Sequence, residues 1–209
     1  MRRWLLPVVL LLLGSSPLTA SAGVPSPSTS TVPPCLVVCP PGDISYTVVV
    51  RDFGSNPISG SMVWLDFSSC TGFVHCPIGN TEGYLWDAPN RRAVGVTDGS
   101  GRVTFAIRGG GVCQPIGVRG VRVYADGIAL ADVFLSSPDQ NGDLMVTNAD
   151  LAIIAAAINT PNPGADFDCD GTVTNADLAF ATNQHGGHTC TSVTGVRSGS
   201  WGRLKTIYR

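Results

Sequence analysis

The sequence predicts a multidomain protein in which an all-β sandwich is followed by a small α-helical module with two acidic loops. Between residues 35 and 137, short apolar or alternating runs are separated by turn residues about every 8 to 12 positions, which is typical of strands in a sandwich. Further on, a 12-residue acidic pattern begins at 139 and again at 166, which is an internal repeat with a period of 27. The strand-like pattern and the acidic repeat differ in periodicity, so we expect two separate domains.

The amino-terminal segment is typical of a secretory signal peptide. Arg2 and Arg3 precede an apolar run of about ten residues, and the small residues Ala20-Ser21-Ala22 form a cleavage site. Such a run is too short to cross a bilayer, which requires roughly 20 residues. The next segment contains mainly Pro, Ser and Thr, so we expect an extended, solvated linker. The sequence therefore predicts a secreted, extracellular protein that does not span a membrane, with a signal peptide over 1–22 and a linker over 23–34.

Six strands are expected in the β domain. The run 102–108 shows the alternation best, because Val103, Phe105 and Ile107 share one face and polar residues occupy the other. Turn residues such as Asp98-Gly99 and Asp126-Gly127 separate the runs. The expected strands are Ile44–Asp52, Met62–Phe67, Ala93–Val96, Arg102–Arg108, Val118–Ala125 and Ile128–Leu135.

Two short motifs of the β domain resemble bacterial immunoglobulin-like domains. The first runs from Val50-Arg51-Asp52 through Gly54, Pro57, Ile58 and Gly60 to Val63, and the second is T-D-x-x-G-x-V-T-F over residues 97–105. Both consist mostly of turn and core positions. The resemblance therefore implies an immunoglobulin-like β-sandwich over 35–137 and implies little about function.

The acidic repeat places oxygen-bearing side chains at positions 1, 3, 5, 9 and 12 of each loop. This is the spacing with which EF-hand loops wrap Ca²⁺, a hard ion that prefers six to eight oxygen ligands. We expect two calcium ions, with a backbone carbonyl contributing at position 7 and threonine at position 9 acting directly or through water. The expected ligands are Asp139, Asn141, Asp143, Met145, Thr147 and Asp150 in the first loop, and Asp166, Asp168, Asp170, Thr172, Thr174 and Asp177 in the second.

The second loop has the more regular pattern. It carries four aspartates against three in the first, and it keeps Gly171 at position 6, where a sharp turn is needed. The first loop has Leu144 at that position and Gly142 two positions earlier, so we expect its backbone to depart from the standard geometry. Solvated turns are the competing interpretation of a single acidic loop, and the repeat argues against it.

An apolar pattern that favours a helix follows each loop, over 148–159 and 175–184. Two loops with Asp at position 12, each followed but not preceded by a helix, resemble the type I dockerin family. That resemblance implies a dockerin-like calcium-binding module over 138–190 that attaches its protein to a cohesin-type partner. It also implies that positions 10 and 11 contact the partner. These are Asn148, Ala149, Asn175 and Ala176.

Seven cysteines in an exported chain favour disulfides over thiol chemistry. Cys169 and Cys190 could pair within the acidic segment. An odd number then remains in the β domain, so their pairing stays open and one thiol is either free or pairs between molecules. The five are Cys35, Cys39, Cys70, Cys76 and Cys113.

Composition argues against some functions and leaves others open. Residues 139–190 contain seven Asp and no Lys or Arg, which gives no support to nucleic-acid binding by the folded part. The tail 191–209 is basic and has the composition of a disordered terminus or of a segment that touches an anionic surface. His185, His188 and Cys190 are a zinc alternative to a disulfide at Cys190.

No catalytic motif is apparent. The chain has one glutamate, Glu82, and no G-x-S-x-G or H-E-x-x-H pattern, so we expect no enzyme. Tyr84, Trp86 and Trp64 offer flat apolar surfaces for a polysaccharide, although core packing explains Trp64 equally well. We expect a secreted, non-catalytic adaptor or structural protein with calcium-dependent attachment to a protein. The alternative is an accessory component of extracellular polysaccharide degradation whose sandwich binds or hydrolyses glycan.

Overall fold

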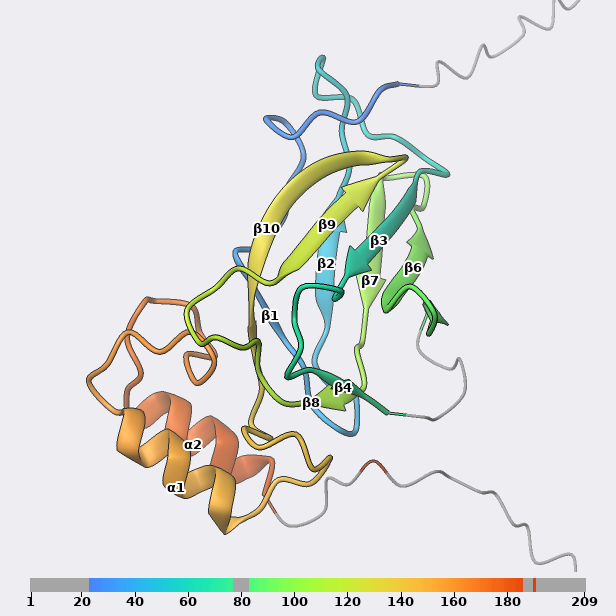
Figure 1. Cartoon of the computed structure of the whole chain (residues 1–209). Coiled ribbons are helices and arrows are strands. Elements are labelled where there is room, and N and C mark those ends of the chain that lie inside the picture. The colour runs from blue at the N-terminus through green and yellow to red at the C-terminus, as the bar shows by residue number, and fades with distance from the viewer. Residues whose placement is uncertain (1–22, 77–82, 186–189, 191–209) are drawn as a thin grey trace, which may run out of the picture.

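The computed structural model describes residues 23–76, 83–185 and 190, and it is mostly β with two short helices (Figure 1). Its largest sheet has six strands in the order β1-β10-β9-β3-β6-β5 and curls in front of β2 and β7, which pair with each other. The short strands β4 and β8 form a third pair. The strands are β1 (Cys35–Val37), β2 (Tyr46–Val49), β3 (Met62–Asp66), β4 (Val74–His75), β5 (Leu85–Asp87), β6 (Arg92–Val96), β7 (Arg102–Phe105), β8 (Gly109–Gly110), β9 (Val121–Ala125) and β10 (Ile128–Ser136).

The main core lies between the curled sheet and the β2-β7 pair. The alternation predicted for 102–108 is confirmed, because Val103, Phe105 and Ile107 are buried while Arg102 and Thr104 are exposed. The six predicted strands are all present, with shorter or slightly shifted ends. The strands that the sequence did not predict, β1, β4, β5 and β8, have two or three residues each, which is too short for alternation to be recognisable.

The two helices begin where the acidic loops end. They are α1 (Asn148–Ala157) and α2 (Asn175–Asn183), and they lie beside each other at one end of the curled sheet (Figure 1). Ile154 and Ala181 are fully buried between them in a small second core that also includes Phe167 and Val173. Half-buried Val37 of β1 packs against this same cluster, so the helices rest on the β part of the chain.

The predicted fold class, an immunoglobulin-like sandwich followed by a separate α-helical dockerin-like module, is wrong. The chain is mostly β with one curled sheet, and its carboxy-terminal part contributes only two short helices rather than a helical module. Hydrogen bonds cross the expected boundary at residue 138: Ser137 N–H donates to Gly164 O (3.1 Å), and Gly111 N–H donates to Asp139 O (2.7 Å). Local periodicity could not reveal this joining, because it depends on contacts between distant segments.

The predicted linker also differs from expectation where the structure describes it. Ser26 is fully buried and its N–H donates to Arg51 O at 2.8 Å, while Thr31 and Val49 form an antiparallel bridge. The segment therefore lies along the end of β2 instead of running free in solvent. The expected signal peptide (1–22) and basic tail (191–209) lie outside the described residues.

Candidate metal centre

Both acidic loops fold around the carboxylate of their first residue. In the first loop the two carboxylate oxygens of Asp139 accept N–H groups from positions 4 and 6, Gly142 and Leu144, at 2.8 Å each. In the second loop Asp166 accepts the equivalent N–H groups, from Cys169 and Gly171, at 2.7 and 2.8 Å. The repeat seen in the sequence is therefore also a repeat of hydrogen-bonded geometry, as expected when one local pattern specifies one turn.

The carboxylate of the last residue of each loop also accepts backbone hydrogen bonds. Asp150 accepts the N–H of Gln140 and of Thr147, both at 2.9 Å, and Asp177 accepts the N–H of Phe167 and of Thr174 at 2.7 and 2.8 Å. The side chain at position 12 thus returns to position 2, which brings the two ends of each loop together. Since Asp150 and Asp177 are buried, their carboxylates point into the loops rather than into solvent.

The middle of each loop is more open. Asn141 and Asp143 in the first loop, and Asp168 and Asp170 in the second, are exposed. The aspartate at position 5 accepts the backbone N–H of position 7 in both loops. Asp143 accepts from Met145 and Asp170 accepts from Thr172, both at 2.9 Å. Exposed carboxylates opposite buried ones leave each loop accessible to an ion from solvent.

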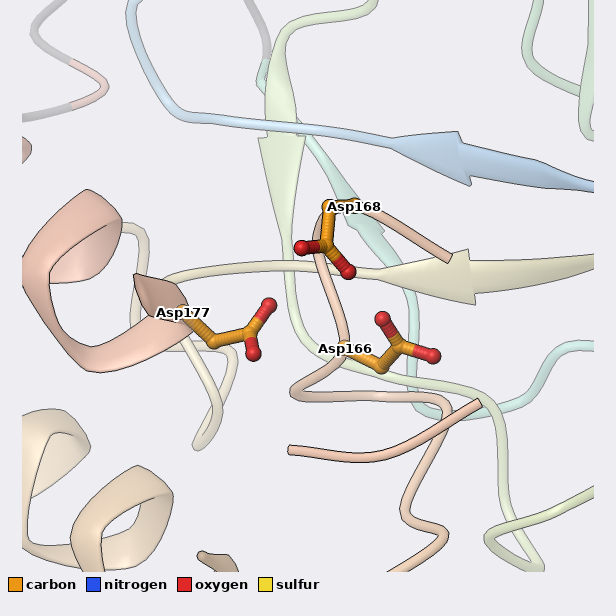
Figure 2. Close-up of side chains that lie close together, drawn as sticks. All are labelled: Asp166, Asp168 and Asp177. Carbon is orange, nitrogen blue, oxygen red and sulfur yellow. The ribbon is translucent and has the colours of Figure 1, made fainter. Parts of the chain in front are cut away.

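The second loop brings three carboxylates to one point. Oxygen atoms of Asp166, Asp168 and Asp177 all lie within 4.8 Å of one another, and their side chains converge in Figure 2. Within the part of the chain that the structure describes, no other group of three His, Cys, Asp or Glu side chains meets this condition. In the first loop Asn141 stands at position 3, and its Nδ2 donates to Asp143 Oδ2 at 3.0 Å, so that loop has one acid fewer.

Burial makes these carboxylates costly to keep charged. It raises the pKa of Asp139 to about 6, and the nearby charges of Asp150 and Asp143 act in the same direction, against the N–H groups of Gly142 and Leu144. Burial likewise raises the pKa of Asp166. Residues 139–190 contain no Lys or Arg that could neutralise them. Oxygen-rich, negatively charged and open on one side, the loops have the donor set that a hard divalent cation prefers.

Thr147 and Thr174 take a role that spacing alone did not predict. Each is the N-cap of a helix, accepting the N–H of Ala149 or Ala176 and donating its own hydroxyl to the position 12 carboxylate at 2.9 or 3.0 Å. These hydroxyls are thus engaged with Asp150 and Asp177 and act as supports for ligands. The S/T-x-x-E capping-box pattern, with Asp in place of Glu, was the sequence signal for this role.

The residues expected to contact a partner are at the starts of the two helices. Asn148 and Ala149 open α1, and Asn175 and Ala176 open α2. All four are exposed, so none is needed for the core.

The aromatic residues considered for glycan binding do not form one surface. Trp64 pairs with Tyr124 and Val94 across the sheet, while Trp86 pairs with Ala93, whose next neighbour is buried Leu65. Since side chains alternate between sheet faces, Trp64 and Trp86 lie on opposite faces. Trp86 stacks on His75 with ring centroids 4.0 Å apart, and partly buried Tyr84 packs against the main core.

The structure contains three disulfides, Cys35–Cys169, Cys70–Cys113 and Cys76–Cys190, and leaves Cys39 as a buried free thiol. The expected disulfides are therefore present, and they indicate an oxidising environment. The pairing considered for Cys169 with Cys190 is wrong, because each is joined to the β part instead. Cys190 in a disulfide removes its sulfur from the zinc alternative, and His188 and Glu82 lie outside the described residues.

Within the described ranges no helix has the length and apolarity needed to cross a bilayer. No family model, curated protein or solved structure matches this chain.

Proposed function

We propose that this protein is a secreted, non-catalytic attachment protein whose two acidic loops bind calcium. The observation that carries the proposal is the shared geometry of the loops, in which the position 1 and position 12 carboxylates are fixed by the same backbone N–H groups in both copies. Fixed carboxylates can meet an ion with little reorganisation, which supports binding.

Calcium is the ion that fits these ligands best. The donors are carboxylate, amide and carbonyl oxygens in a loop that is open on one side, whereas zinc sites favour Cys and His. The ligand set we propose for the second loop is the carboxylates of Asp166, Asp168, Asp170 and Asp177 with the carbonyl of Thr172, and Asp139, Asn141, Asp143, Asp150 and the carbonyl of Met145 form the equivalent set in the first.

The attachment surface that we propose is the pair of exposed helix starts. Asn148, Ala149, Asn175 and Ala176 adjoin the position 12 ligands, so an ion that orders the loops also orders these residues. A cohesin-type protein is the partner class that the loop pattern implies. Calcium dependence of the attachment follows, because the ion stabilises only the ordered loops.

Calorimetry on the full secreted chain tests the calcium proposal. We expect two ions per chain, and Asp168→Asn should weaken binding at the second loop on the order of tenfold, because it removes one ligand charge. Asp43→Asn is the matched control, since Asp43 is an exposed aspartate outside both loops. Absence of calcium uptake by the intact chain would sink the proposal.

Attachment needs a separate test. The immobilised chain should retain a partner from the source organism's extracellular proteins in calcium and release it in EDTA. The quadruple variant Asn148→Asp, Ala149→Asp, Asn175→Asp, Ala176→Asp should lose that partner while keeping both ions. Retention that persists in EDTA, or in the quadruple variant, would contradict this surface.

A further inference from the structure

We propose that the Cys35–Cys169 disulfide regulates the second loop: when a dithiol reduces it, the loop is released from β1 and its calcium affinity falls. This inference rests on the calcium binding proposed above and adds a redox control to that same site.

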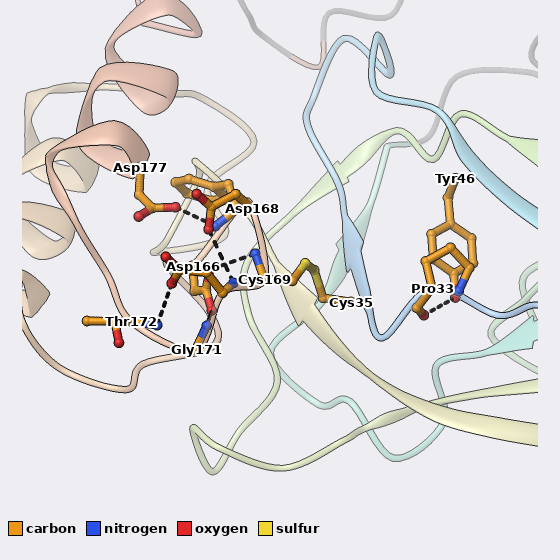
Figure 3. Close-up of a disulfide and its surroundings, with 11 residues drawn as sticks. Pro33, Cys35, Tyr46, Asp166, Asp168, Cys169, Gly171, Thr172 and Asp177 are labelled. Carbon is orange, nitrogen blue, oxygen red and sulfur yellow. Dashed lines mark hydrogen bonds between the residues drawn. A yellow bond between two sulfur atoms is a disulfide. The ribbon is translucent and has the colours of Figure 1, made fainter.

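Cys169 is part of the loop itself. It occupies position 4, between Asp168 and Asp170, and its N–H donates to a carboxylate oxygen of Asp166 at 2.7 Å (Figure 3). Its backbone is left-handed, with φ of 64°, a conformation that residues other than glycine seldom adopt. The crosslink therefore holds the residue that orients the first ligand of the loop.

The other end of the crosslink is fixed in the main sheet. Cys35 begins β1, is only 8% exposed, and pairs in parallel register with Phe134 of β10. A loop tied to such a strand has fewer alternative conformations than a loop held by hydrogen bonds alone. The disulfide thus favours the arrangement in which Asp166 and its neighbours converge.

Solvent reaches this disulfide from the Cys169 side, because Cys169 is half-buried whereas Cys35 is buried. Cys35 and Cys169 both line a half-open pocket of about 370 Å³, whose walls include Pro34, Arg119 and Phe134. By contrast, Cys70 and Cys113 are buried in the main core at 0% and 4% exposure. A small dithiol therefore reaches the loop disulfide before it reaches the core disulfide.

The chemical step is thiol–disulfide exchange. One thiolate of the dithiol attacks a sulfur of the disulfide, the S–S bond breaks, and a mixed disulfide forms with one cysteine while the other leaves as a thiolate. The second thiol of the reductant then displaces the first cysteine. Two electrons and two protons pass to Cys35 and Cys169, which become thiols, and the reductant becomes a cyclic disulfide.

Loss of the crosslink lowers the calcium affinity of the second loop because the binding-competent conformation of that loop becomes less populated. If that conformation is populated about one tenth of the time without the tether, the apparent calcium affinity falls about tenfold. Because such coupling is reciprocal, bound calcium must also oppose reduction of this disulfide.

The first test compares calcium affinities of crosslinked and uncrosslinked chains. The second loop is measured in an Asn141→Ala/Asp143→Ala background, which disables the first loop. Adding Cys35→Ala/Cys169→Ala should then weaken binding about tenfold. Cys76→Ala/Cys190→Ala is the matched control: its disulfide also joins the carboxy-terminal segment to the β part, but Cys190 N–H contacts Leu144 O of the first loop at 3.0 Å. This control should leave the second loop within about twofold.

Equal affinity of the second loop with and without the Cys35–Cys169 crosslink, while the wild-type chain binds two ions, would overturn this inference and leave the proposed calcium binding intact. A crosslinked chain that takes up no calcium would overturn both.

A second test needs no variant. The intact chain is equilibrated with a mixture of reduced and oxidised dithiothreitol, quenched with an alkylating agent and analysed by mass spectrometry. Saturating calcium should lower the equilibrium ratio of reduced to oxidised Cys35 and Cys169 about tenfold relative to EDTA, with Cys70 and Cys113 still unlabelled. Equal ratios in calcium and EDTA would contradict the coupling even if the double cysteine variant failed to fold.

Discussion

Leu144 occupies a backbone conformation that usually belongs to glycine. Its φ is 67°, and Gly171 at the same position of the second loop has φ of 96°. At position 4 it is the first loop that has the glycine: Gly142 has φ of 75°, and Cys169 of the second loop has φ of 64°. Each loop therefore needs two left-handed residues and has a single glycine for them. The expectation that Leu144 makes the first loop depart from the standard turn is wrong, because Leu144 adopts the turn at a cost in strain.

Relief of that strain should stabilise the protein. We predict that Leu144→Gly raises the free energy of unfolding by about 1 kcal/mol relative to Leu144→Ala, because the left-handed region costs residues with a Cβ roughly that amount. Leu144→Ala is the matched control, since it removes the same half-buried side chain but keeps the Cβ. Urea denaturation in EDTA measures the difference. Equal stabilities of the two variants would show that Leu144 carries no such strain.

His75 gives the β part a dependence on pH. Burial lowers its pKa from 6.5 to about 4, and its ring stacks on Trp86 while Nε2 lies 3.1 Å from Tyr84 Oη. The unfolded chain therefore binds the proton more readily than the folded one. Stability contributed by neutral His75 is fully present above about pH 6.5 and is lost progressively as the pH falls toward 4.

The prediction is a difference between two titrations. In saturating calcium, the wild-type free energy of unfolding should decline between pH 6.5 and 4 more steeply than that of His75→Gln, whose side chain does not titrate. Chemical denaturation at several pH values gives both curves. If the curves run parallel, the proton on His75 has no effect on folding.

At the scale of elements, each loop and the helix after it form one unit. The threonine at position 9 of each loop is the N-cap, and the aspartate at position 12 is the third helical residue of a capping box. The repeated Val-Thr-Asn-Ala-Asp thus performs two tasks, since it positions the carboxylate proposed as a ligand and it begins a helix. The negative carboxylate near the helix start is also favoured by the helix dipole.

Loss of the cap should therefore weaken both the helix and the site. We predict that Thr174→Ala lowers stability in EDTA by about 1 kcal/mol, the usual cost of an N-cap, and also weakens calcium binding at the second loop. Thr172→Ala is the control, because Thr172 is exposed and contributes only backbone groups. Thermal melts and calorimetry measure the two effects. A Thr174→Ala protein that matches Thr172→Ala in both would contradict the shared role.

At the scale of the whole molecule, the first loop is built against the β part. Asp139 is fully buried, and its carboxylate lies against Gly110 of β8, where there is no room for a Cβ. Gly111 N–H donates to Asp139 O, and the backbone of Gly111 also lies close to Gly142. Asp139, the first ligand proposed for this loop, is therefore positioned partly by β8, a strand that comes much earlier in the chain.

This contact predicts a long-range effect of a small substitution. Gly110→Ala should displace Asp139 and weaken calcium binding at the first loop about tenfold or more, while the second loop changes little. Gly99→Ala is the matched control, since a Cβ at Gly99 meets no atom within 4 Å and its backbone φ is not positive. Calorimetry on the full chain resolves the two sites. Unchanged binding at the first loop would mean that Gly110 does not constrain Asp139.

The local features of the fold and of the candidate site could be predicted from the sequence. Strand positions followed from alternation, helix starts followed from the apolar pattern after each loop, and the spacing of Asp139 to Asp150 and of Asp166 to Asp177 located the candidate ligands. All of these depend on residues within about a dozen positions, where chain geometry fixes which side chains meet. The acidic cluster of Asp166, Asp168 and Asp177 lies inside one such window.

How these local features join could not be predicted, because it depends on contacts between distant parts of the folded chain. The partner of Cys169 is Cys35, 134 residues away, and the partner of Cys190 is Cys76, so the expected separate module is attached to the β part by one disulfide in the second loop and another after α2. The strand register that places Trp64 and Trp86 on opposite faces of the sheet likewise cannot be predicted from local patterns. The physical reason is that disulfides and sheet neighbours depend on which distant surfaces bury each other, and periodicity carries information only about neighbours along the chain.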